Sequence, residues 1–167
     1  MRNKKGFTTF ELVVVVAVVA ILALVALPKF HHLTQRAEAL NVQGMIGQMR
    51  GALSMQMARG LYRGDNLAAW AYSGSKPLYP MRDLLLKPPK SYLGVLTGSN
   101  KRGHWYDDKN SHELVYVVRN SEIVSGISGE PKKLRWRIEV AYENHAAKKT
   151  LLGLLLQPST PHQWLFE

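Results

Sequence analysis

The chain has 167 residues, a formal net charge of +10 and no cysteine. This length leaves room for one small domain and one membrane segment, and it excludes a large multidomain enzyme. Without cysteine, disulfides and cysteine-based metal or redox sites are excluded, so stability has to come from an apolar core.

The chain begins with a short basic segment, residues 1–6, which contains Arg2, Lys4 and Lys5 and ends at Gly6. It carries three of the positive charges. Without it, the remaining excess of positive charge is modest, so the charge pattern marks this end of the chain rather than the whole protein.

An apolar stretch follows from Phe7 to Leu27, interrupted only by Thr8, Thr9 and Glu11. At the helical rise of 1.5 Å per residue it reaches about 31 Å, close to the hydrocarbon thickness of a bilayer. The sequence therefore predicts a transmembrane and assembly helix over residues 7–28. Because the basic residues precede the span, the positive-inside rule places the N-terminus in the cytoplasm and the residues after about Lys29 across the inner membrane. The C-terminal domain is expected in the periplasm or outside the cell, and at the cell surface once it is part of a pilus.

A secretory signal peptide is the first alternative, and a generic single-span anchor is the second. The signal peptide fits poorly, because the apolar region is longer than the usual 7–15 residues and lacks a small-x-small cleavage site. Glu11 is a second feature that neither a signal peptide nor a generic anchor explains. A carboxylate within an apolar span costs about 2.5–3.5 kcal/mol on insertion scales, which indicates a functional role and a partner.

The segment around this carboxylate, residues 5–15, resembles the processing and methylation site of type IV prepilins and type II secretion pseudopilins. In that family a membrane peptidase cuts after the glycine and methylates the new N-terminus. The resemblance implies cleavage between Gly6 and Phe7, N-methylation of Phe7, and a prepilin peptidase/methyltransferase as partner. It also implies that Glu11, the fifth mature residue, and the helix-kinking Pro28 serve assembly.

The physical chemistry agrees with this resemblance. A free amine at Phe7 lies about 6 Å along the helix axis from Glu11. A neighbouring subunit, displaced along a bundle, could bring its amine against this carboxylate and offset the burial of both charges.

Residues 29–60 are predicted to continue the helix as an amphipathic segment. Its apolar positions recur at helical spacing and comprise Val42, Met45, Ile46, Met49, Leu53 and Met57. Glycines at 44, 47 and 51 indicate either close approach of a sheet or a locally soft helix, and the sequence leaves both open. Gly60 and Gly64 are the predicted helix stops.

Residues 61–103 are rich in proline, glycine and serine, which predicts a loop-rich connector. Residues 104–167 are predicted to form an antiparallel sheet, with strands at 105–106, 113–119, 134–142 and 151–156. In the third of these, Leu134, Trp136 and Ile138 alternate with Arg135 and Arg137, the pattern of a half-buried strand. A long helix followed by an antiparallel sheet is an α+β arrangement, and it resembles the pilin fold.

Segments 26–40, 105–107 and 117–120 look most like pilins of the mannose-sensitive haemagglutinin type. The absence of cysteine departs from pilins that close a C-terminal disulfide loop, which favours a minor or accessory subunit. The resemblance implies other pilin subunits and an inner-membrane assembly platform as partners. The alternatives are a type II secretion pseudopilin and a bitopic periplasmic binding module.

Two clusters could bind ligands. Asp107 and Asp108, with Asn110 and Glu113, form an oxygen-rich turn that could hold calcium, as major pseudopilins do in a comparable loop. A solvated turn is the favoured alternative, because the spacing is not that of an EF-hand.

The second cluster is basic and contains Lys132, Lys133, Arg135 and Arg137. It could contact nucleic-acid phosphates, but Trp136 points to the opposite strand face, so a solvated face is favoured. The six histidines match no metal-binding spacing and no nucleophile or phosphate-loop motif occurs, so no enzymatic activity and no obligatory cofactor are expected.

Overall fold

In the computed structural model the described residues are 7–64, 80–145 and 148–165. The chain divides into two compact units, Met1–Ala37 and Glu38–Glu167. The second unit is called the head below, and each unit is described by itself.

The long helix α1 extends over Thr9–Arg63. It ends where Gly64 adopts a φ of +75° and donates its N–H to the Leu61 carbonyl at 3.1 Å. Glycine takes this left-handed conformation without the steric penalty of a side chain. The predicted helix stop at Gly64 is thereby confirmed, and the helix continues through Gly60.

The head contains a five-stranded sheet with the strand order β1-β2-β3-β5-β6. Its strands are β1 (Tyr92–Val95), β2 (His104–Asp108), β3 (Glu113–Val117), β5 (Lys133–His145) and β6 (Lys148–Pro158). A second, two-stranded sheet pairs β4 (Val124–Ser125) with β7 (Gln163–Trp164). The helix and the mostly antiparallel sheet confirm the predicted α+β fold.

One edge of the sheet carries a strand from outside the predicted sheet region 104–167, since β1 pairs with β2 in parallel. The structure also places a short helix, α3 (Pro80–Leu84), in the segment expected to be irregular. Both elements are short, and β1 contains Gly94 at a φ of +90°. Neither presents enough residues for a periodic pattern to emerge from the sequence.

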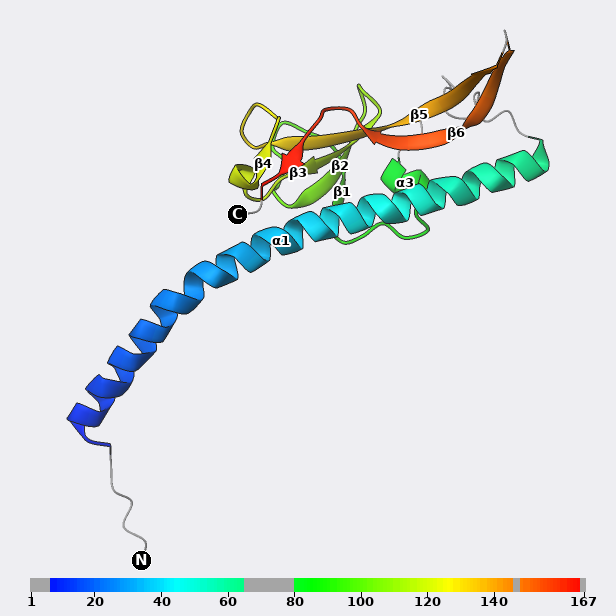
Figure 1. Cartoon of the computed structure of the whole chain (residues 1–167). Coiled ribbons are helices and arrows are strands. Elements are labelled where there is room, and N and C mark those ends of the chain that lie inside the picture. The colour runs from blue at the N-terminus through cyan, green and yellow to red at the C-terminus, as the bar shows by residue number, and fades with distance from the viewer. Residues whose placement is uncertain (1–6, 65–79, 146–147, 166–167) are drawn as a thin grey trace, which may run out of the picture. The chain divides into compact units, whose positions relative to one another are not determined.

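The core of the head lies between α1 and one face of the sheet (Figure 1). The helix contributes Val42, Ile46, Met49 and Leu53, each at most 5% exposed. The sheet contributes Trp105, Leu114, Leu134, Trp136, Leu154 and Leu156. The predicted apolar stripe of the helix is therefore confirmed. Gly44, Gly47 and Gly51 are exposed with no described neighbour where a Cβ would stand, so no close approach of the sheet explains these glycines.

The two faces of the sheet have different surroundings. Trp105 and Trp136 face the helix, and their ring centroids are 5.5 Å apart. On the opposite, outer face, Tyr106, Val115 and Val117 form a smaller buried cluster with Leu96 packed against it. Successive strand residues point to opposite faces, so Arg135 lies on the outer face between the core residues Leu134 and Trp136. This confirms the predicted alternation of β5.

Candidate assembly site

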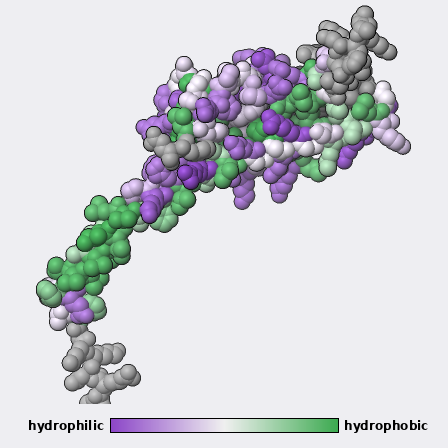
Figure 2. Space-filling model, in the orientation of Figure 1, coloured by the Kyte–Doolittle hydropathy of each residue, from purple (hydrophilic) through white to green (hydrophobic). Residues whose placement is uncertain are grey.

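The N-terminal part of α1 exposes apolar side chains on all sides. Figure 2 shows hydrophobic residues covering this part of the helix. An 18-residue window within α1 has a mean hydropathy of 3.1, and none of that window is buried in the protein. A helix that is apolar all round has to be covered by lipid or by other helices, because water solvates it poorly.

Thr8 begins this helix as its N-cap. Its Oγ1 accepts a hydrogen bond of 3.2 Å from the N–H of Glu11, and its carbonyl accepts one of 3.1 Å from Leu12. Threonine followed three residues later by glutamate is the sequence signature of a capping box. In the sequence Thr8 stands out only as an interruption of the apolar stretch, but the Thr-x-x-Glu spacing is the local signal of its capping role.

The capping geometry fixes Glu11 in the first turn of the helix. The residue is exposed, and within the described part of the chain its carboxylate has no hydrogen bond or ion pair. A negative charge in the first turn is favoured by the helix dipole, but that contribution is only about 0.3–1 kcal/mol. In a lipid environment the carboxylate still needs a partner from outside this chain's described residues.

Phe7 lies just before the helix and is 72% exposed. Gly6 and the predicted cleavage bond between Gly6 and Phe7 fall at the edge of the described residues, because residues 1–6 lie outside them. Cleavage and methylation at this position therefore stay predictions.

Pro28 lies inside α1, which continues on both sides of it. Because proline has no N–H, the Leu24 carbonyl lacks its usual helical donor at this point. The structure thus places the predicted assembly residue Pro28 within a continuous helix, and not at a helix end.

Comparison with known families identifies the N-terminal segment. The family described as the prokaryotic N-terminal methylation motif matches residues 1–27. The N-terminal segment thus carries the methylation motif that supports a type IV pilin or pseudopilin relationship. No curated protein and no solved structure matches it. This motif implies assembly with other pilins and processing by a prepilin peptidase, and together with the apolar helix it supports anchoring in a membrane.

In the head, a buried carboxylate joins α1 to the sheet. Glu38 on α1 is 9% exposed, and its Oε1 accepts hydrogen bonds from the Tyr116 hydroxyl at 2.8 Å and from the Arg119 N–H at 2.7 Å. Burial, followed by the negative charge of Glu38, raises the pKa of the Tyr116 hydroxyl above its ordinary value. Tyr116 therefore stays neutral and keeps its proton for this bond.

The calcium candidates Asp107 and Asp108 lie on opposite faces of β2, since they are successive strand residues. Asp107 is 1% exposed and accepts a hydrogen bond from the Tyr92 hydroxyl. Asp108 pairs with Arg135 at 2.9 Å. Among the described residues no group of three acidic or histidine side chains is arranged to hold a metal ion. Calcium binding stays a prediction and has no part in the function proposed below.

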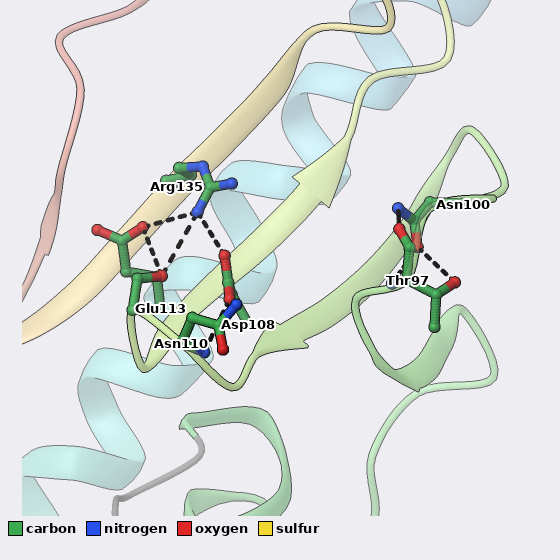
Figure 3. Close-up of polar contacts among 7 residues, drawn as sticks. Thr97, Asn100, Asp108, Asn110, Glu113 and Arg135 are labelled. Atoms are coloured by element: carbon green, nitrogen blue, oxygen red, sulfur yellow. Dashed lines mark hydrogen bonds and ion pairs between the residues drawn. The ribbon is translucent and has the colours of Figure 1, made fainter.

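Arg135 connects the ends of β2 and β3 on the outer face (Figure 3). Its Nη1 lies 2.9 Å from both Asp108 Oδ2 and Glu113 Oε2. Burial alone would raise the pKa of the Asp108 carboxyl, but hydrogen bonds, first of all from Arg135, lower it below its ordinary value. The oxygen-rich turn expected from the sequence is thus organised around an arginine of this chain.

The basic cluster is partly neutralised within the head. Besides the two acids at Arg135, Glu139 pairs with Arg137 at 3.3 Å, and Lys132 Nζ donates to the Val124 carbonyl. Trp136 is buried on the opposite face, as expected. The arrangement therefore offers no aromatic platform beside these charges for a nucleic-acid base.

Proposed function

We propose that this protein is a structural subunit, of the minor or accessory kind, of a type IV pilus. It is inserted in the inner membrane with its N-terminus in the cytoplasm and its head in the periplasm. After cleavage between Gly6 and Phe7 and N-methylation of Phe7, it enters the filament through the apolar part of α1.

The observation that carries this proposal is the unpartnered Glu11 in the first turn of an apolar helix. Cleavage after Gly6 creates a positive amine close to this carboxylate. When subunits are staggered along a filament, the amine of one subunit pairs with Glu11 of the next. Each charge then has a counter-charge in the low-dielectric helix bundle, where an unpaired charge is strongly destabilising.

Thr8 supports the same arrangement. By capping the helix it holds Glu11 at a defined position relative to the new N-terminus. Pro28 and the remaining apolar residues form a helix surface that water solvates poorly. This favours a subunit that is held in the membrane before assembly and whose helix packs in a helix bundle afterwards.

N-terminal sequencing and mass spectrometry of the protein in sheared surface fibres test this proposal. The expected result is a chain that begins at N-methyl-Phe7. An intact Met1 in assembled material would contradict processing. It would favour the alternative of a bitopic membrane protein that is not processed.

The location of the processed protein then distinguishes a pilus from a secretion pseudopilus. Immunogold labelling of the head on long surface fibres is expected for a pilus subunit. Processed protein that is confined to the cell envelope would contradict the pilus role and favour the pseudopilin alternative.

A further inference from the structure

The apolar span of α1 is followed by a short segment of basic and apolar residues, which is called the juxtamembrane segment below. It comprises Lys29, Phe30, His31, His32 and Leu33. All five residues are helical and exposed, and the two apolar side chains Phe30 and Leu33 are 64% and 60% exposed. The segment lies within the compact unit Met1–Ala37.

The length of the span determines the depth of this segment in a membrane. The headgroup layers add about 5–8 Å on each side of a hydrocarbon core of about 30 Å, which the stretch from Phe7 to Leu27 fills. At the helical rise of 1.5 Å per residue, Lys29 to His32 lie about 3–8 Å beyond Leu27 along the helix axis. Their side chains therefore lie at the level of the lipid phosphate groups.

No acid of the same helix is available to these groups. The sequence contains no acidic residue between Glu11 and Glu38. In the part of the chain that the structure describes, no hydrogen bond or ion pair of the Lys29 ammonium or of the His31 and His32 rings is found. The segment therefore presents a positive charge and two imidazole rings whose partners have to come from outside the chain.

The positions of the three groups around the helix favour lipid over a protein partner. Lys29 and His32 are three residues apart and share one face, whereas His31 lies about 160° around the helix from Lys29. A protein docked on the helix covers one face. Lipid headgroups surround a membrane helix on all sides and so reach all three side chains.

We propose that the juxtamembrane segment binds the phosphate groups of anionic phospholipids through the Lys29 ammonium and the His31 and His32 rings. Phe30 and Leu33 lie between these groups and contact the upper acyl chains, as apolar side chains of interfacial helices do. The proposal rests on the membrane insertion proposed above, and it applies to a pilus subunit and to a secretion pseudopilin alike.

The histidines make this contact dependent on pH. Histidine is the side chain that ordinarily gains its charge between pH 8 and 5, so binding of an anionic lipid strengthens as the pH falls. The other charged groups of α1 nearest to the two rings are Lys29, Arg36 and Glu38. Glu38 already accepts two hydrogen bonds within the head.

Native mass spectrometry of the detergent-solubilised full chain tests the proposal. The probes are phosphatidylglycerol, phosphatidylcholine with the same acyl chains, and glycerol phosphate as the soluble headgroup. Phosphatidylglycerol is expected to bind at least about fivefold more tightly than phosphatidylcholine at pH 7.5, since one lysine near an anionic surface supplies a factor of this size. The preference is expected to increase at pH 6.

Variants separate this segment from the basic residues 1–6, which also attract anionic lipids. Lys29→Gln is expected to lower the preference for phosphatidylglycerol about fivefold at both pH values. The double variant His31→Gln/His32→Gln is expected to keep the preference at pH 7.5 and to lose its increase at pH 6. Lys109→Gln, at an exposed lysine of the head, is the matched control and should change neither.

Four results would overturn the proposal: equal binding of the two lipids, displacement of phosphatidylglycerol by equimolar glycerol phosphate, an unchanged preference in both variants, or an equal loss in Lys109→Gln. The titration uses unassembled protein and does not require cleavage after Gly6. A failure of this proposal is therefore distinguishable from a failure of the filament role.

Discussion

The Glu38 carboxylate on α1 accepts a 2.8 Å hydrogen bond from the hydroxyl of Tyr116, which lies 78 positions later in the chain. The same oxygen accepts the N–H of Arg119. One acid at the start of the head thus joins the helix to β3 and to the turn that follows it. The contact orients the helix against the sheet, beyond what the apolar stripe does alone.

Replacing Glu38 is expected to destabilise the head. Glu38→Ala leaves the buried Tyr116 hydroxyl without an acceptor, at a cost of about 1–3 kcal/mol, and it also removes the acceptor of the part-buried Arg119 N–H. The expected loss in the free energy of unfolding is about 2–4 kcal/mol, and it is smaller for Glu38→Gln, which keeps an acceptor oxygen. Tryptophan fluorescence during denaturation measures it, because Trp105 and Trp136 lie in the head core. Equal stability of Glu38→Ala and the exposed control Glu122→Ala would refute this role.

Asp107 is expected to make the head less stable as the pH rises from about 4 to 6. Burial raises the pKa of its carboxyl to about 6, whereas the unfolded chain has an ordinary pKa near 3.8. Between these values the folded state binds more protons than the unfolded state, so the free energy of unfolding falls, by about 2–3 kcal/mol, and then levels off. Melting temperatures from pH 3.5 to 7.5 measure this.

Asp107→Asn provides the control for this pH dependence. It keeps the shape and removes the titrating group, so the decline between pH 4 and 6 is expected to flatten. Asp108→Asn is expected to act differently, because the pKa of Asp108 is lowered and its ion pair with Arg135 stabilises the head above pH 4. An unchanged decline in Asp107→Asn would show that another group titrates.

The exposed helix glycines are expected to be sites of stabilisation. Gly44→Ala, Gly47→Ala and Gly51→Ala each add a Cβ into open space and reduce the conformational entropy of the unfolded chain. Each is expected to raise the free energy of unfolding of the unassembled subunit by about 0.5–1 kcal/mol. Gly64→Ala is the contrasting control and should destabilise, because its φ is +75°. A loss of stability in Gly44→Ala, Gly47→Ala and Gly51→Ala would contradict the finding that the space around these glycines is open.

A fragment that begins at Phe30 is expected to be soluble and folded. Every buried member of the main core cluster lies between Val42 and Leu156, so the head contains its own core without the apolar span. Circular dichroism should show helix and strand with a cooperative melting transition. A disordered spectrum would show that the head depends on the preceding helix.

Glu11→Ala is expected to leave the protein made and inserted but to reduce its entry into filaments. Removing a carboxylate from an apolar span eases insertion by up to about 3 kcal/mol, so its membrane location should persist. In the filament, the amine of a neighbouring Phe7 would lose its counter-charge, at a cost of about 3–5 kcal/mol.

The measurement is the ratio of sheared-fibre to membrane-bound protein in cells where the other subunits are unchanged. Glu122→Ala, which removes an exposed carboxylate of the head, is the matched control. Glu11→Asp should assemble better than Glu11→Ala. If Glu11→Ala gives the wild-type ratio, the Glu11 carboxylate is not the assembly contact.

The sequence by itself determined the features that depend on neighbouring residues. The apolar span, the carboxylate Glu11 within it and the match to the methylation motif are all contiguous. The stripe from Val42 to Leu53 and the alternation of β5 were also readable, because helical and strand periodicity repeat within one segment. These patterns were sufficient to predict the α+β fold and the resemblance to pilins.

Only the tertiary structure decided which distant residues meet. It joined Glu38 to Tyr116 and gave Asp107 and Asp108 different partners on two faces of one strand. The parallel pairing of β1 was equally hidden, since a four-residue strand carries too little periodicity. Such contacts depend on the register and packing of segments far apart in the chain, which no local pattern of residue types encodes.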